Sequence, residues 1–157
     1  MSAFHREPAR PDIATGLRTA RPEAANGTVV RVLLDTNAFL YWTAGGKKLS
    51  PRARKVIENP RNEILLSSVS SWEIAIKHAM GKLDLPESPR KFVLSRLARH
   101  SIGGLAFEHS DALAVADLPD HHDDPFDRAL IAQALERDLA VVPSDERFDE
   151  YGVTVEW

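Results

Sequence analysis

The sequence predicts one α/β domain built on a mainly parallel sheet. Short apolar runs rich in Val, Leu and Ile alternate with longer segments whose apolar residues recur at helical spacing. This alternation is typical of strand–helix–strand units, in which right-handed crossovers place helices on the faces of a parallel sheet. The 157 residues contain no visible internal repeat or second set of such units, so we expect a single domain.

The strands are predicted from their β-branched and Leu content. Residues 1–29 are rich in Ala, Pro, Arg and Thr and show no sustained periodicity, so we interpret them as a flexible N-terminal extension. Residues 30–157 are the predicted folded domain. Within it, strands are expected in the segments "VVRVLLDT", "NEILLSS", "GLAFE", "LAVV" and "VTVEW".

The helix starts are marked by capping residues. Ser50–Pro51 and Ser88–Pro89 each place a Ser N-cap before a Pro at the first helical position, which satisfies a free amide and pre-sets φ. The other helices are expected from Asn37 to about Trp42, in "SSWEIAIKHAMGK" ending at Gly81, in "SDALAVADLP" and in "PFDRALIAQALERD".

Composition limits the chemistry that the chain can perform. With 43% apolar and 27% charged residues it has the composition of a soluble globular protein. There is no cysteine, so any metal must be held by oxygen or imidazole ligands. No apolar run approaches the roughly 20 residues of a membrane span. We therefore expect a soluble, cytoplasmic protein.

The two halves of the predicted domain differ in charge. Residues 31–99 hold 13 Lys and Arg against 6 Asp and Glu, whereas residues 100–157 hold 3 against 14. Folded together, the halves would present a basic surface beside an acidic pocket, an arrangement that suits a polyanion handled through metal ions. Two ordinary solvated faces would give the same imbalance.

Five acidic residues lie where strands end or helices begin: Asp35, Glu73, Asp124, Asp127 and Asp145. Each has an ordinary structural interpretation as a helix cap, an acid that favours the helix dipole, or a turn residue. The segment D-P-F-D at 124–127 in particular matches an N-cap Asp, a Pro at the first helical position and an acid at the third.

A parallel sheet nevertheless brings several strand ends and helix starts to one edge. Three or four carboxylates gathered there would repel one another, and burial and like charge would raise their pKa values unless a divalent cation lay among them. Oxygen ligands suit Mg²⁺ or Mn²⁺. Such ions bind phosphate oxygens and activate water, so the pattern favours nuclease chemistry.

Two neighbouring histidines, His121 and His122, suggest zinc as an alternative. Adjacent histidines in a loop lack the i, i+4 spacing of paired helical ligands. We therefore expect both to lie in a solvated loop.

Three segments resemble one known family: "VLLDTNAFLYW", "LSSVSSWEIAIKHAMGKLDLP" and "HHDDPFDRALIAQALERDLAVVPSDERFDEYGVTVEW". They are similar to the PIN-domain ribonucleases of the VapC toxin type, over essentially residues 31–157. The resemblance implies a three-layer α/β/α domain and a Mg²⁺- or Mn²⁺-dependent endoribonuclease. It also implies the toxin half of a toxin–antitoxin pair, inhibited by a VapB-like partner and commonly homodimeric.

The resemblance also implies roles for individual residues. Four acids match the family's metal-holding and catalytic acids, in the order Asp35, Glu73, Asp127 and Asp145, with Asp124 as an auxiliary candidate. Supporting donors around them are Thr36, Asn37, Ser71 and Ser144, of which Asn37 is expected to orient Asp35. Apart from the resemblance, their charge makes Arg128, Lys82, Lys47 and Lys48 candidates for contacts with RNA, but a structural salt bridge explains Arg128 equally well and ordinary surface positions explain the lysines.

One residue departs from the family pattern. Pro143 stands where the family usually has Thr, two residues before the fourth acid. Because proline offers no hydroxyl, we expect Asp145 to be supported by Ser144, a backbone amide or water. The departure leaves open a catalytically weak PIN-fold module whose role is partner binding and regulation.

A phosphatase with Asp35 as covalent nucleophile is a further alternative, since such enzymes also begin with an Asp at a strand end. They generally place a general acid/base Asp two residues later. Here that position is Asn37, which weakens this alternative.

Overall fold

The computed structural model describes residues 29–156. The predicted extension, residues 1–29, lies outside the described residues except for Val29. Its boundary with the domain therefore stays a prediction.

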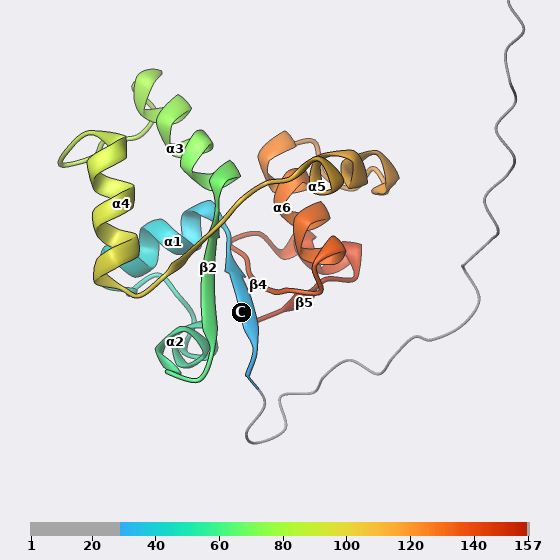
Figure 1. Ribbon diagram of the computed structural model, residues 1–157, viewed down its shortest axis with the longest axis horizontal. Helices are drawn as coiled ribbons and strands as arrows, with labels where there is room; N and C mark the ends of the chain where they lie inside the picture. The colour runs from blue at the N-terminus through green and yellow to red at the C-terminus, as the bar shows by residue number, and fades with distance from the viewer. Residues whose placement is uncertain (1–28, 157) are drawn as a thin grey trace, which may run out of the picture.

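A five-stranded sheet forms the centre of the molecule (Figure 1). Its order is β3-β2-β1-β4-β5, and all four pairings are parallel. The strands are β1 (Arg31–Leu34), β2 (Glu63–Ser67), β3 (Gly103–Leu105), β4 (Ala140–Val142) and β5 (Thr154–Val155). The mainly parallel sheet predicted from the sequence is confirmed, with β1 at its middle.

Helices connect the strands and begin where the capping residues indicate. They are α1 (Thr36–Thr43), α2 (Pro51–Glu58), α3 (Ser68–Ala79), α4 (Pro89–Arg99), α5 (His109–Ala114) and α6 (Pro125–Glu136). Ser50 and Ser88 cap α2 and α4 through their side chains, as predicted. Two 3-10 helices follow α5 and β4: η1 (Val115–Asp117) and η2 (Glu146–Tyr151). The η2 helix was not predicted.

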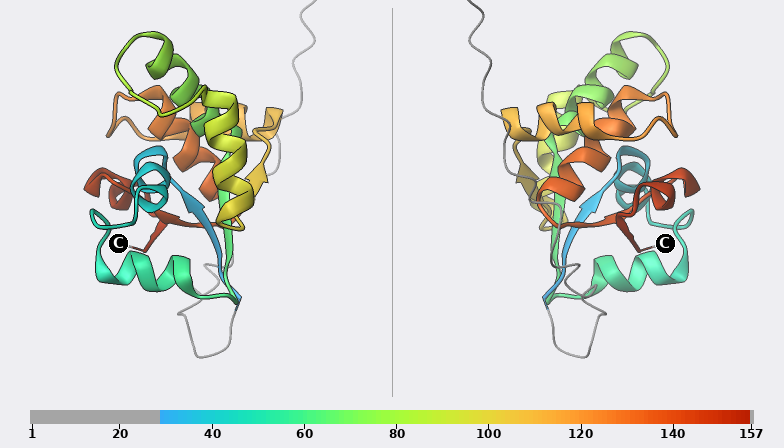
Figure 2. Two further views of the ribbon diagram at one scale, coloured as in Figure 1. Left: turned by 90° about the vertical axis from the view of Figure 1, so that its left-hand side faces the viewer. Right: turned by 90° about the vertical axis from the view of Figure 1, so that its right-hand side faces the viewer.

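The sheet is covered on both faces (Figures 1 and 2). Val32 and Leu34 point into a core shared with Phe39 of α1 and Phe92 of α4. Leu33, between them, points into a second core shared with α6 and η2. All three strand residues are fully buried, which explains the uninterrupted apolar run. The three layers are helix, sheet and helix. Between residues 29 and 156 no helix combines the length and the apolar character needed to cross a membrane.

Candidate active site

The four predicted acids come together at the carboxyl edge of the sheet. Asp35 follows β1, Glu73 lies in α3 after β2, Asp127 lies in the first turn of α6 and Asp145 follows β4. Burial and, to a lesser extent, the nearby negative charges of Asp124 and of the other three acids together raise the pKa of Asp127 to about 7. We call Asp35, Glu73, Asp127 and Asp145 the acid cluster.

Asp35 is the most deeply buried member, with 1% of its surface exposed. It caps α1, because Oδ1 accepts a hydrogen bond from Ala38 N at 2.7 Å. Oδ2 accepts from both the backbone N–H and the hydroxyl of Ser144, the latter at 2.7 Å. Burial raises the pKa of Asp35, although the bonds from Ala38 and Ser144 act in the opposite direction.

Two predicted supporting roles change accordingly. Ser144 was expected to support Asp145, but it serves Asp35 because the turn after β4 points its N–H and hydroxyl back toward β1. Asn37 reaches Asp35 only through this serine, since its Nδ2 donates to Ser144 Oγ at 3.3 Å.

Glu73 is held from two sides and is 4% exposed. The Thr36 hydroxyl donates to Oε2, as its predicted supporting role requires, and Lys77 Nζ lies 2.6 Å from Oε1. Thr36 Oγ1 also lies 3.0 Å from Ser70 Oγ, which leaves the Ser70 hydroxyl to donate to Thr36. Ser71 was predicted as a supporting donor, but within the described residues it is Ser70 whose side chain contacts Thr36. The fully buried Ser70 takes its place.

Asp124 starts α6 and so positions Asp127. Its Oδ1 accepts from the backbone N–H groups of Phe126 at 2.8 Å and Asp127 at 3.2 Å. The cap interpretation of Asp124 is confirmed.

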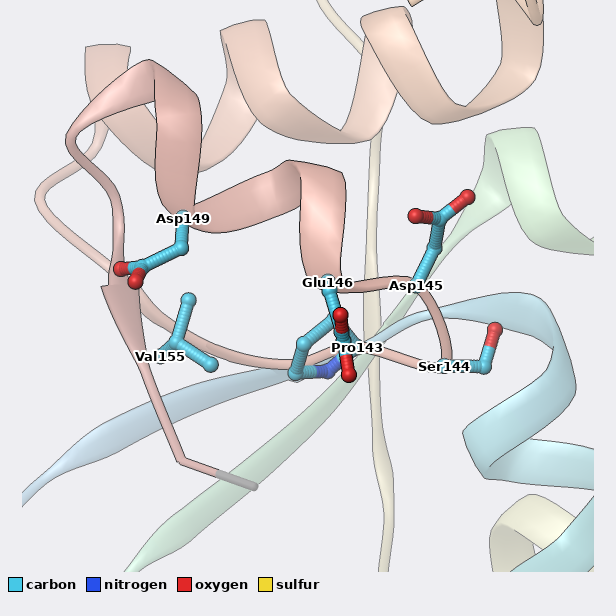
Figure 3. Close-up of a pocket in the computed structure, with 6 residues that line it drawn as sticks. All are labelled: Pro143, Ser144, Asp145, Glu146, Asp149 and Val155. Carbon is cyan, nitrogen blue, oxygen red and sulfur yellow. The ribbon is translucent and has the colours of Figure 1, made fainter.

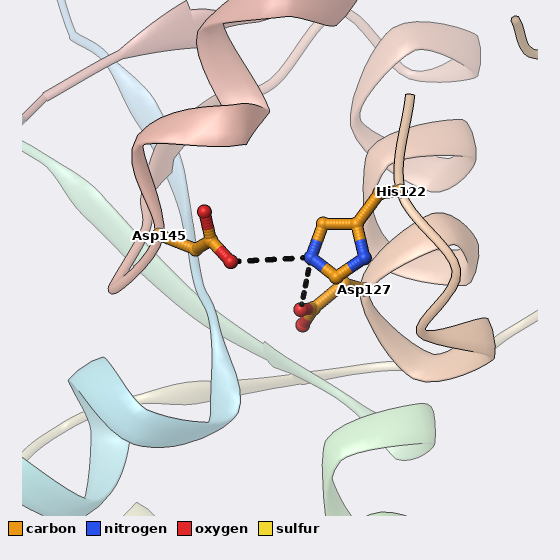
Figure 4. Close-up of side chains that lie close together, drawn as sticks. All are labelled: His122, Asp127 and Asp145. Carbon is orange, nitrogen blue, oxygen red and sulfur yellow. Dashed lines mark hydrogen bonds and ion pairs between the residues drawn. The ribbon is translucent and has the colours of Figure 1, made fainter. Parts of the chain in front are cut away.

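His122 is a member of the site that the sequence did not reveal. It is 4% exposed rather than solvated, so that expectation is wrong for this residue. Its Nδ1 lies 3.0 Å from Asp124 N and accepts that N–H, which places the ring proton on Nε2. Nε2 in turn lies 3.0 Å from Asp127 Oδ2 and 3.2 Å from Asp145 Oδ2 (Figure 4).

This tautomer decides what His122 does. The ligand atoms of His122, Asp127 and Asp145 all lie within 4.8 Å of one another, close enough to surround a cation. However, Nε2 carries a proton aimed at the two carboxylates and offers no lone pair. His122 therefore acts as a hydrogen-bond donor between the two acids rather than as a metal ligand. His121 lies apart, with Nδ1 3.8 Å from Glu150.

Asp145 forms hydrogen bonds and an ion pair with Arg147. Arg147 donates from its backbone N–H to Oδ1 at 2.9 Å and from Nη2 to Oδ2 at 2.7 Å. These hydrogen bonds and the positive charge lower the pKa of Asp145 to about 2. Asp145 thus obtains from Arg147 and His122 the support that Pro143 cannot provide. A backbone amide was among the predicted supports, and that of Arg147 provides it; the side chains of Arg147 and His122 were not predicted in this role.

A pocket of about 390 Å³ adjoins Asp145 between η2 and β5. In Figure 3 the Asp145 carboxylate is directed away from Pro143 and Val155, and its Oδ2 lies 3.2 Å from His122 Nε2. The pocket is lined by Pro143, Ser144, Asp145, Glu146, Asp149 and Val155.

The predicted RNA-contacting residues do not join the cluster. The Arg128 guanidinium donates to the carbonyl oxygen of Pro119 at 2.9 Å and to that of Val115 at 3.4 Å, and it fastens the segment before α6. These hydrogen bonds favour the structural role of Arg128, and its contact with substrate stays a prediction. Lys47 and Lys48 follow the far end of α1, and Lys82 follows the far end of α3, whereas the acids lie near the helix starts.

Comparisons with known proteins agree with the observed fold. The family model described as "PIN domain" matches residues 32–153. Ribonuclease VapC22 of Mycobacterium tuberculosis is 30% identical over 117 residues, which are 74% of this chain and 88% of that protein. Ribonuclease VapC16 of the same organism is 40% identical over 57 residues, which cover only 36% of this chain and 40% of that protein.

A solved structure has the same fold. It is VapBC2 from Rickettsia felis bound to a DNA fragment from their promoter, and one of its chains is similar with a TM-score of 0.59 at 16% identity. The similarity covers 81% of this chain and 98% of that one.

Proposed function

The chain belongs to the PIN-domain family, and from this premise we propose that it is a divalent-metal-dependent endoribonuclease of the VapC type. One observation carries the proposal: four carboxylates from four separate elements share one edge of the sheet, and the pKa of Asp127 is raised to about 7. Such concentrated negative charge is costly without a cation. The name of the relative VapC22, a ribonuclease, supports the same activity.

The donor set fits Mg²⁺ or Mn²⁺. Carboxylate oxygens are the ligands that these hard cations prefer, and Asp35, Glu73, Asp127 and Asp145 would hold the ion, with Asp124 close by. When bound, the ion supplies charge neutralisation and water activation for phosphodiester hydrolysis. The expected products carry 5′-phosphate and 3′-hydroxyl ends.

The chain's own residues hold these acids in place. Ser144 fixes Asp35, and Thr36 fixes Glu73. The Nε2–H of His122 sets the separation between the carboxylates of Asp127 and Asp145. Each acid is therefore held in one orientation before substrate arrives, which is the preorganisation that hydrolysis of a charged ester needs.

Incubation of the purified protein with RNA tests the activity. We expect cleavage with Mg²⁺ or Mn²⁺, none with EDTA, and none by Asp35→Asn. Arg31→Ala is a matched control, because Arg31 pairs with Glu63 on the surface at the opposite end of the strands. Cleavage that survives EDTA, or that persists in Asp35→Asn, contradicts the proposal.

As partners we propose RNA as substrate, a VapB-like antitoxin and a second copy of the chain. The related VapBC2 chain was solved in a complex of that name, and exposed apolar side chains such as Trp72 and Leu113 offer contact area. Such a toxin would work in the cytoplasm. Light scattering tests the homodimer. Neutralisation of growth arrest by a small adjacent gene tests the antitoxin.

The alternative as a phosphatase loses support. Such an enzyme needs an acid/base residue two positions after Asp35, and Asn37 at that position cannot give up or take a proton; its Nδ2 donates to Ser144 Oγ. The alternative as a catalytically weak module rested on Pro143 alone. Because Arg147 and His122 contact Asp145, the missing hydroxyl no longer argues for inactivity.

A further inference from the structure

Arg147 holds a carboxylate oxygen that the proposed cation would also need. Its Nη2 lies 2.7 Å from Asp145 Oδ2, and its Nε lies 3.1 Å from both carboxylate oxygens. The same Oδ2 receives the Nε2–H of His122 at 3.2 Å. The Arg147 side chain is 51% exposed, so the guanidinium lies between the acid cluster and solvent.

Among the arginines of residues 100–157, Arg147 is the one whose side chain is not engaged with a backbone carbonyl or a buried acid. Residues 100–157 contain three basic side chains, Arg128, Arg137 and Arg147. Arg128 is engaged with backbone carbonyls, and Arg137 forms a two-pronged pair with Asp111, whose side chain is fully buried. In the described residues Arg147 has polar contacts only with Asp145. It can move without disturbing the core.

A cation bound by Asp145 would weaken the hold of that carboxylate on Arg147. The cation and the Arg147 guanidinium would share the same lone pairs of the Asp145 oxygens, and exposed ion pairs are already weak. The guanidinium cannot shed its charge, so it then needs another anion. Its forked N–H groups match two phosphate oxygens, and the phosphate acted on at the cluster would be the nearest such anion.

We therefore propose that Arg147 is a substrate-binding residue that exchanges Asp145 for an RNA phosphate once a divalent cation occupies the acid cluster. This inference rests on the proposed function. It differs from a purely positioning role for Arg147, in which the arginine would keep hold of Asp145 throughout and would help the cation to bind.

The exchange predicts that Arg147→Ala raises the affinity for Mn²⁺ and lowers the affinity for RNA. Without RNA, Mn²⁺ affinity measured by electron paramagnetic resonance is expected to rise about twofold to fivefold, because the Arg147 guanidinium no longer competes with Mn²⁺ for Asp145. RNA binding is measured with a fluorescein-labelled 20-nucleotide RNA of mixed sequence, in Ca²⁺, which we expect to support little hydrolysis. Under these conditions the affinity of Arg147→Ala for the RNA is expected to be about tenfold or more below that of the wild type. Without any divalent cation, the variant and the wild type should bind this RNA alike.

Two further variants sharpen the comparison. Arg31→Ala removes an exposed arginine from a similar surface pair far from the cluster and should leave both affinities unchanged. Arg147→Lys keeps the charge but loses the fork, so its RNA affinity should be intermediate. Melting temperatures of all variants check that each is folded.

Weaker Mn²⁺ binding by folded Arg147→Ala overturns the exchange, since it means that the arginine only positions Asp145. Unchanged RNA affinity in the presence of Ca²⁺ overturns it as well. These outcomes leave cleavage by the wild type intact. Failure of the wild type to bind Mn²⁺ or to cleave RNA instead refutes the proposed function, and the exchange with it.

Discussion

One N–H of His122 joins two carboxylates of the acid cluster, since Nε2 lies 3.0 Å from Asp127 Oδ2 and 3.2 Å from Asp145 Oδ2. These acids come from α6 and from the loop after β4. A shared polar hydrogen reduces the repulsion that would otherwise drive them apart. His122 thus partly performs, in the protein alone, the bridging that a cation would perform.

Replacement of this histidine is expected to matter most without metal. His122→Ala removes the shared donor and leaves the Asp124 N–H without its acceptor, so the free energy of unfolding in EDTA should fall by about 1–3 kcal/mol. Saturating Mg²⁺ should restore part of the loss. His121→Ala is the control, because His121 is exposed and its ring contacts Tyr151 and Glu150 but not the acid cluster. Urea unfolding measures the free energy of unfolding of each variant. If His122→Ala loses as much of it in Mg²⁺ as in EDTA, His122 does not act as the bridge between the two acids.

Asp127→Asn should make the metal-free protein more stable at pH 8. The pKa of Asp127 is raised from 3.8 to about 7. Between these values the folded state holds a proton that the unfolded state has lost, so stability falls as the pH rises from about 4 to 7. The penalty is complete above pH 7 and amounts to about 2–4 kcal/mol. Asparagine never ionises and still accepts from His122.

Thermal melting in EDTA at pH 5 and pH 8 measures this effect. The wild type should lose stability between the two pH values more than Asp127→Asn does, so the advantage of the variant should be smaller at pH 5 than at pH 8. If the melting temperatures of both proteins change equally with pH, the group with the raised pKa is not Asp127. In either case Asp127→Asn should bind Mg²⁺ poorly.

Metal affinity should rise with pH, whereas the stability of the metal-free protein falls. Mg²⁺ needs the ionised carboxylate, and Asp127 is mostly protonated below pH 7. The apparent affinity is therefore expected to rise up to about tenfold per pH unit between pH 5 and 7 and to level off above pH 7. Calorimetric titration measures it directly. Affinity that is flat over this range would contradict a role for Asp127 as ligand.

Thr36 offers a test of how Glu73 is held. Thr36→Val keeps the shape of the side chain but removes the hydroxyl that donates to Glu73 and receives the Ser70 hydroxyl. We expect Mg²⁺ affinity to fall about fivefold to tenfold, equivalent to about 1–1.4 kcal/mol. Thr36→Ser retains the hydroxyl and should stay near the wild type. If both variants bind alike, the hydroxyl does not orient Glu73.

Much of the fold could be predicted because its signals are local. The run through Val32, Leu33 and Leu34 is uninterrupted because both faces of β1 are covered. The Ser-Pro pairs at 50 and 88 fix helix starts through their own backbone. Asp35 and Asp127 were expected together because a parallel sheet gathers its strand ends at one edge.

The supporting contacts could not be predicted because they depend on packing between distant segments. Ser70 and Ser71 differ by about 100° around α3, and only the position of α1 decides which one meets Thr36. His122 is buried because the loop before α6 folds over the cluster. A loop histidine carries no periodic signal for that.

The bond between Ser144 and Asp35 joins residues 109 positions apart. A chain emerging from the ribosome therefore displays Asp35 and Glu73 long before the segment that orients Asp35 has been made. The cluster is completed only when β4 and the turn after it add to the edge of β1. Newly synthesised protein would thus lack a complete acid cluster until the segment around Ser144 has been translated and has folded against β1.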